Sequence, residues 1–234
     1  MDVFVASVVL TAGAPVLAVV ALGNRLFLGP GILYSQARGG YRGDTFEVLK
    51  FRSMLHEQGT DGVTLTIEER SHPWGEMLRK TSLDEIPGLL NVLSGEMCLV
   101  GPRPLVARYL DRYDEQQAQR HRLPPGLTGL AQTSGRNLLT WEEKFELDNA
   151  YIDRVSVGTD LTILATTAWQ MLTPWRNRGT DHATEFRGSI HRHIDQRVDN
   201  NNASERNRTL VRSCLLYTSP SPRDQRGSRM PSSA

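Results

Sequence analysis

The chain has 234 residues and a formal net charge of +1, so it is long enough for one domain with a substantial core. This charge balance gives no overall field that would indicate nucleic acid or a strongly acidic partner. The two cysteines, Cys98 and Cys214, form neither a disulfide framework nor a metal-binding pattern, which is typical of a reducing compartment.

The first feature along the chain is an uncharged apolar segment from Val3 to Gly23. About 20 helical residues, at about 1.5 Å each, cross a hydrocarbon core of about 30 Å. A membrane element is favoured over a secretory signal because no basic lead-in precedes the segment. Pro15 predicts a kink, so the helix either crosses the bilayer or leaves by the face it entered. Basic residues after the segment place that flank in the cytoplasm: Arg25, Arg38, Arg42, Lys50 and Arg52.

Extended segments follow around a glycine-rich turn. Residues 32–34 and 45–51 are predicted to be strands, and residues 39–43 form the turn between them. Another short apolar strand is predicted at residues 97–100. It leads to Arg103, which the flanking prolines hold in a stiff extended backbone. A rigidly presented arginine is a good phosphate clamp.

The chain is organised around two adjacent carboxylates, Asp84 and Glu85, which lie between a basic pair and a proline. Because proline fits the first turn of a helix, a helix is predicted to begin near Leu83 or Asp84 and to stop at Gly95. The N–H groups at such a helix start favour a phosphate. A simpler interpretation is that Asp84 only caps the helix and that Glu85 completes a capping box with Ser82.

Further helices are expected in the second half. Residues 105–122 are predicted to form one charged amphipathic helix with a solvated face, and residues 141–152 another. Residues 160–172 form an apolar amphipathic stretch that fits either a membrane surface or ordinary core packing. From Arg176 onward the apolar content collapses, which indicates disorder, and the last ~20 residues are similar to translated vector sequence.

Taken in order, these stretches resemble the bacterial sugar transferase family, the monotopic polyprenyl-phosphate phosphoglycosyl transferases. The resemblance covers residues 2–173, and its specificity comes from the joint order of the motifs. The chain departs from the family in lacking a basic lead-in and in having Ala14 before the helix proline. The motifs are the apolar helix with Pro15, Lys50–Met54, Leu78–Pro87, Asn91–Met97, Val100–Pro104, Pro125–Gln132, Gly135–Asn137 and Trp141–Lys144.

The resemblance implies an α+β fold. It would be a mostly helical, membrane-associated catalytic domain with a re-entrant N-terminal hydrophobic helix, a small β element and interfacial amphipathic helices. Residues 1–24 would form the re-entrant helix, residues 25–175 the sugar-phosphate transferase domain, and residues 176–234 a disordered tail. The resemblance places the protein among the lipids of the inner (cytoplasmic) membrane, with the catalytic domain on the cytoplasmic face, and it allows a homodimer.

The resemblance also implies an enzyme that transfers sugar-1-phosphate from a UDP-sugar to polyprenyl (undecaprenyl) phosphate, releases UMP and requires Mg²⁺. Such a step initiates lipid-linked exopolysaccharide, O-antigen, capsule or glycoprotein glycan synthesis. Asp84 would be the nucleophile that forms a phosphosugar intermediate, and Glu85 would hold the metal with it or act as a base. Arg79, Arg103 and Arg136 would bind substrate phosphates. The alternative is a non-catalytic membrane-anchored assembly or regulatory subunit. The motifs do not indicate which sugar is transferred.

Overall fold

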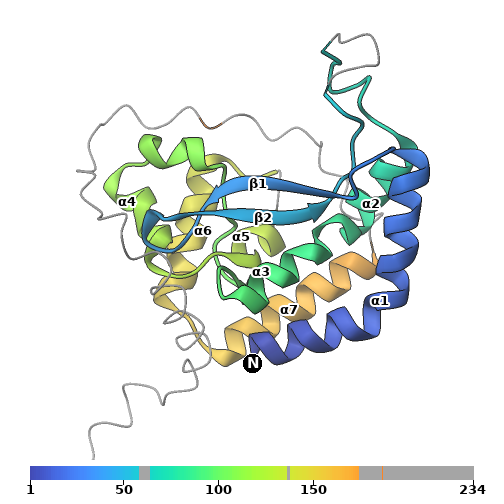
Figure 1. The fold of residues 1–234 in the computed structure, drawn as a ribbon. Coiled ribbons are helices and arrows are strands. Elements are labelled where there is room, and N and C mark those ends of the chain that lie inside the picture. Colours follow the sequence, from blue (N-terminus) through green and yellow to red (C-terminus); the bar gives the residue numbers. More distant parts are fainter. Residues whose placement is uncertain (58–63, 136–137, 174–185, 187–234) are drawn as a thin grey trace, which may run out of the picture.

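The computed structural model describes residues 1–57, 64–135, 138–173 and 186, and it confirms a mixed α and β fold in which helices predominate (Figure 1). The strands form two small sheets. In chain order the elements are α1 (Asp2–Phe27), β1 (Leu33–Gly39), η1 (Tyr41–Gly43), β2 (Thr45–Phe51), α2 (Pro73–Thr81), η2 (Leu83–Gly88), α3 (Leu89–Ser94), β3 (Cys98–Val100), η3 (Ala107–Arg112), α4 (Glu115–Ala118), η4 (Gln119–Arg122), β4 (Gly126–Thr128), α5 (Leu130–Ser134), α6 (Trp141–Asp153) and α7 (Val157–Leu172), where η marks a 3₁₀ helix.

The expected pair of strands around a turn is confirmed as a hairpin, although β1 runs to Gly39, beyond the expected end of the first strand at residue 34. Strands β1 and β2 pair antiparallel, with Tyr34 opposite Lys50 and Arg38 opposite Phe46. The turn between them contains Arg42 at a φ of 56° and Gly43 at a φ of 82°, where glycine is the residue that meets least strain. The expected strand at residues 97–100 is also confirmed as β3, which pairs in parallel with β4.

Helix α1 is the candidate membrane element. Among the residues that the structure describes, it is the one helix long and apolar enough to cross a bilayer. Pro15 lies in its interior, and Figure 1 shows α1 as two limbs that meet at a marked bend. Ala6 in the first limb joins the core around α3, whereas Val20 in the second packs with Phe51 and Leu78.

Both ends of α1 are held by the same domain. At the start, the backbone N–H of Leu99 donates to the Asp2 carboxylate at 3.1 Å. Near the end, Asn24 is buried; its amide nitrogen donates to the Arg52 carbonyl at 2.9 Å, and its oxygen accepts from the Trp74 indole at 2.9 Å. Both ends of α1 are therefore fixed to the same domain.

Arg52 ends α1. Its guanidinium donates to the carbonyl oxygens of Leu28 and Gly29, each at 2.8 Å. Leu28 is the C-cap residue of α1, so its carbonyl is one of the orphan acceptors at the helix C-terminus, and a cation there also complements the helix dipole. Arg52 follows directly after β2, so this contact joins the end of the apolar helix to the hairpin.

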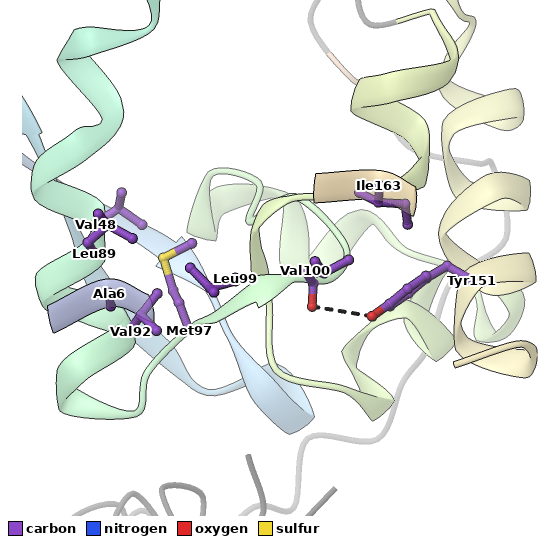
Figure 2. Close-up of a cluster of buried hydrophobic side chains, with 9 residues drawn as sticks. All are labelled: Ala6, Val48, Leu89, Val92, Met97, Leu99, Val100, Tyr151 and Ile163. Atoms are coloured by element: carbon purple, nitrogen blue, oxygen red, sulfur yellow. Dashed lines mark hydrogen bonds between the residues drawn. The ribbon is translucent and has the colours of Figure 1, made fainter. Parts of the chain in front are cut away.

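The main core lies between the hairpin, α1, α3 and the β3 strand. Figure 2 shows Leu89 and Val92 of α3 beside Val48 of β2 and Met97. At the other end of the cluster, the Tyr151 hydroxyl lies 3.4 Å from the Val100 carbonyl, and it donates to Asp160 at 2.7 Å. These contacts join α6 and α7 to β3.

A second, aromatic cluster contains Tyr109, Tyr113, Phe145 and Phe186. Phe186 is 3% exposed, and its carbonyl accepts a hydrogen bond of 2.6 Å from Arg112. This residue belongs to the 176–234 range that was expected to be a disordered tail. Phe186 is the one described residue of that range, and the rest of the expected tail lies outside the described residues.

The single helix expected over residues 105–122 is wrong. The segment forms three short pieces, because Tyr113 is extended and Asp114 then caps α4 through a capping box with Gln117. The expected solvated face is also wrong for Arg120, which is 3% exposed and pairs with Asp148 at 2.8 Å. The helices expected at residues 141–152 and 160–172 are confirmed as α6 and α7.

Candidate active site

The two adjacent carboxylates lie on a short 3₁₀ turn. Helix α2 ends at Ser82, whose φ of 56° reverses the chain, and η2 then carries Asp84 and Glu85 into α3. The expected helix start near Leu83 is therefore confirmed, although its first turn is 3₁₀, and Gly95 ends α3 at a φ of 81°. Ser82 makes no side-chain capping bond, so the capping-box interpretation of Glu85 is wrong.

Glu85 instead binds two cations from other parts of the fold. Its Oε1 atom accepts from Lys50 Nζ at 2.7 Å and from Arg103 Nη2 at 2.5 Å. Its Oε2 atom lies 3.4 Å from Arg103 Nη1. Burial alone would raise the pKa of this carboxyl, but the Arg103 and Lys50 charges and their hydrogen bonds hold it far below its usual range. Glu85 is thus ionised at neutral pH.

Asp84 has the opposite character. Its side chain is buried, at 8% exposure, and desolvation together with the neighbouring Glu85 charge raises its pKa to about 6. Lys50 and Arg103 act in the other direction but do not cancel this effect. Two adjacent carboxylates with pKa values driven apart in this way suit different tasks. A carboxylate with a raised pKa is the more basic of the two and the better nucleophile.

Two site residues, Arg38 and Lys50, were not among the sequence-predicted site residues. Arg38 of β1 donates to the Pro104 carbonyl at 3.2 Å and to the Gln36 side chain at 2.6 Å. Side chains alternate along a strand and opposite partners share a face, so the pairing of Tyr34 with Lys50 puts Lys50 and Arg38 on one face of the hairpin. That alternation was the signal in the sequence.

A small cavity lies at this cluster. Its volume is about 30 Å³, and its lining includes Arg38, Lys50, Glu85 and Arg103. The cavity therefore lies between the hairpin and the rigid loop that follows β3. Asp84 is not part of this lining.

Arg79 and Arg136 are the other predicted phosphate-binding residues, and Arg79 is not among the residues that line this cavity. Arg79 donates to the Ser53 carbonyl at 3.0 Å and lies 3.4 Å from the Ser71 hydroxyl, so its described contacts hold neighbouring loops. Arg136 lies outside the described residues. Across the described part of the chain, no group of three or more His, Cys, Asp or Glu side chains could enclose a metal. A metal at Asp84 and Glu85 would need further oxygen ligands.

Both α1 and α7 carry exposed apolar side chains. In the most apolar 18-residue stretch of α1, only 11% of the residues are buried inside the protein. Trp169 of α7 is 60% exposed. The opposite sides of both helices join the same core through Ala6 and Ile163. The exposure of Trp169 fits the membrane-surface interpretation of α7 rather than complete core packing. Further exposed apolar residues of the two helices are Phe4, Val19, Leu22, Leu26, Leu161 and Leu172.

Comparison with known proteins shows which protein family the sequence matches. The family model described as Bacterial sugar transferase matches residues 1–174. An uncharacterised sugar transferase, EpsL, of Bacillus subtilis is 46% identical over 167 residues, which are 70% of this chain and 83% of the relative.

Two other relatives carry more specific names. A UDP-glucose:undecaprenyl-phosphate glucose-1-phosphate transferase of Caulobacter vibrioides is 37% identical over 183 residues, covering 74% of this chain and 68% of the relative. A protein of the same name from Escherichia coli is 35% identical over 179 residues, covering 72% of this chain but 39% of the relative. The match to the Escherichia coli protein therefore spans well under half of its length.

Proposed function

Because the chain belongs to the bacterial sugar transferase family, we propose that it transfers sugar-1-phosphate from a UDP-sugar to a polyprenyl phosphate and releases UMP. The names of the Caulobacter and Escherichia coli relatives support this reaction class. The observation that carries the proposal is the pairing of a buried, basic Asp84 with a Glu85 that two cations keep ionised. A regulatory subunit that used this turn only as a helix cap would not need that arrangement.

The first step is a displacement at phosphorus. A carboxylate oxygen of Asp84 attacks the sugar-bearing phosphorus, the bond from that phosphorus to the bridging oxygen breaks, and UMP leaves with the bridging oxygen. The sugar phosphate is then joined to Asp84 as an acyl phosphate. In the second step, an oxygen of the lipid phosphate attacks the same phosphorus, releases the Asp84 carboxylate and forms the lipid diphosphate sugar.

The cations lower the cost of bringing these anions together. Two unit charges about 4 Å apart repel by roughly 4 kcal/mol at an effective dielectric of 20. A diphosphate donor and the Asp84 carboxylate bring several such repulsions. Arg103, held in position by its flanking prolines and its contact with Glu85, is the described arginine best placed to offset them. Arg79 and Arg136 remain predicted phosphate ligands.

Mg²⁺ is part of the proposal. This cation takes oxygen ligands and is commonly held by one or two carboxylates together with substrate phosphates. The adjacent Asp84 and Glu85 carboxylates fit that donor set, and Glu85 Oε2, whose Arg103 contact is the longer one at 3.4 Å, is the oxygen best placed to accept a metal. When bound, the ion would neutralise phosphate charge.

The acceptor explains the apolar surface. Each CH₂ group that leaves the bilayer costs about 0.8 kcal/mol, so an isoprenoid lipid stays in the membrane and only its phosphate reaches the surface. We propose that α1 is re-entrant and that, with the exposed side of α7, it seats the domain on the cytoplasmic face of the inner membrane. The support is the attachment of both α1 ends to the same domain. The homodimer remains a prediction.

The test is a search for the covalent intermediate. The membrane-bound protein is incubated with a panel of UDP-hexoses and UDP-N-acetylated amino sugars without acceptor, quenched, and analysed by mass spectrometry. We expect one equivalent of UMP and a mass increase of one sugar phosphate at Asp84. The Asp153→Asn protein is the matched control, because Asp153 is an exposed aspartate at the end of α6. Full turnover with no adduct at residue 84 would reject the covalent mechanism.

A further inference from the structure

Three basic side chains from separate elements line one small cavity. Arg38 comes from β1, Lys50 from β2 and Arg103 from the loop after β3. The hairpin register fixes the first two on one face, and the prolines on either side of Arg103 restrict the third. Their convergence is therefore built into the fold.

The described groups at this cavity leave positive charge in excess. Glu85 is the carboxylate of the lining, and it already contacts both Lys50 and Arg103. The hydrogen bonds that Arg38 makes are to a carbonyl and an amide, both of which are neutral. Burial and the nearby Arg103 charge lower the pKa of Arg38, and the Glu85 charge opposes them only in part.

Uncompensated buried charge is costly to a fold, and it is retained where it serves a ligand. An anion in the cavity would contact a guanidinium, an ammonium and a second guanidinium together. Phosphate oxygens match the fork of donors that an arginine presents, and a lysine adds a compact charge. A volume of about 30 Å³ has room for a small polar group.

We propose that Arg38, together with Lys50 and Arg103, binds one phosphate group of a substrate in this cavity, and this rests on the proposed transferase function. The Pro104 carbonyl holds the Arg38 guanidinium in its orientation at 3.2 Å. Arg38 thus becomes a substrate-binding residue, in addition to Arg103. The phosphate belongs either to the donor diphosphate or to the lipid, and the two sources share this chemistry.

Binding can be measured without turnover. The full chain in lipid nanodiscs is titrated with inorganic pyrophosphate by calorimetry. Arg38→Gln removes the charge but keeps an amide that can donate to Pro104, and Arg38→Lys keeps the charge. Arg42→Gln is the matched control, since Arg42 lies in the turn of the same hairpin and stacks on Tyr41. We expect Arg38→Gln to weaken pyrophosphate binding by about 10- to 100-fold, the loss of one charged hydrogen-bonding partner, and Arg38→Lys to weaken it less.

The two half-reactions then identify the source of the phosphate. UMP release without acceptor reports the donor, and consumption of the preformed adduct by undecaprenyl phosphate reports the lipid. A rise in the half-saturating concentration of either substrate in Arg38→Gln, with Arg42→Gln unchanged, supports the proposal and names the substrate. Unchanged pyrophosphate binding in a folded Arg38→Gln protein overturns it. If the wild-type protein binds pyrophosphate through Arg38 but turns over no UDP-sugar, the transferase assignment fails and the phosphate site stands.

Discussion

The guanidinium of Arg120 donates a hydrogen bond of 2.6 Å to the main-chain carbonyl of Arg103. Arg120 itself is buried in an ion pair of 2.8 Å with Asp148 of α6, and it lies over the Phe145 ring at 5.3 Å. A chain of contacts therefore runs from α6 through Arg120 to the backbone of the arginine that binds Glu85. The rigidity of Arg103 comes from this support as well as from its flanking prolines.

Removing the charge of Asp148 should both destabilise the protein and weaken the site. Asp148→Asn leaves Arg120 buried without its counter-charge, and breaking a buried pair in this way costs about 3–5 kcal/mol. Denaturant unfolding in detergent measures the free energy of unfolding. Asp153→Asn at the exposed end of the same helix is the control, and we expect it to change this free energy by less than about 0.5 kcal/mol. A cost below about 1 kcal/mol for Asp148→Asn would show that the pair does not hold the loop.

The rate of the donor half-reaction should fall in acid. In the proposed mechanism Asp84 attacks only when it is ionised, and burial with the Glu85 charge raises its pKa to about 6. Because protonation removes the nucleophile, kcat/KM for UMP release should decline as the pH falls through about 6. In Glu85→Gln the neighbouring negative charge is lost, so the acid limb of the residual activity should move to lower pH. A flat profile from pH 5 to 8 would contradict the assignment of Asp84 as the nucleophile.

Substitution of the two carboxylates should have distinguishable effects. Asp84→Asn removes the oxygen that we propose as the nucleophile, and we expect UMP release to fall on the order of 1,000-fold or more with no adduct. Glu85→Gln keeps the nucleophile but leaves Lys50 and Arg103 without their carboxylate, so a slow adduct should still form. Quenched-flow mass spectrometry separates the two cases. If the Asp84→Asn protein still accumulated a sugar-phosphate adduct on another residue, that residue would be the nucleophile instead of Asp84.

Metal removal should stop the reaction reversibly. Since the diphosphate and two carboxylates gather several negative charges, chelation should abolish UMP release, and added Mg²⁺ should restore it. A second readout is thermal stability: Mg²⁺ with UMP should raise the Tm of the wild-type protein more than that of Glu85→Gln. The opposite outcome, full turnover in excess chelator, would remove the metal from the mechanism.

The junction of α1 with α2 should be sensitive to a single methyl group. A Cβ built at Gly23 would lie 2.1 Å from the Trp74 ring, so Gly23→Ala must displace either the ring or the helix. We expect a loss of about 1–3 kcal/mol in the free energy of unfolding and a smaller membrane-bound fraction. Gly13→Ala is the matched control in the same helix, because nothing lies within 4 Å of its added Cβ and alanine is the better helix former. Equal behaviour of the two variants would show that the junction does not hold α1.

Sequence patterns correctly predicted the elements whose conformation depends on residues close together in the chain. The hairpin follows from alternation and a glycine turn, and α6 follows from the helical pattern that Thr140 caps. Contacts between residues far apart in the chain could not be predicted from these patterns. The charges of residues 105–122 indicated a solvated face, yet the partner that buries Arg120 lies on α6, well beyond any helical spacing. In the same way, the sequence left a local cap open as an alternative for Glu85, because Lys50 becomes its neighbour only after folding.

Arg52 and Lys50 lie two positions apart on the chain, and their side chains contact two different parts of the protein. Arg52 holds the carbonyls that terminate α1, whereas Lys50 holds Glu85. Two extended residues span about 7 Å, and a paired strand has little freedom to stretch. The C-terminal end of α1 and the Glu85 carboxylate are therefore attached to the same stiff strand, so in the proposed transferase a displacement of α1 within the bilayer would be transmitted to Glu85.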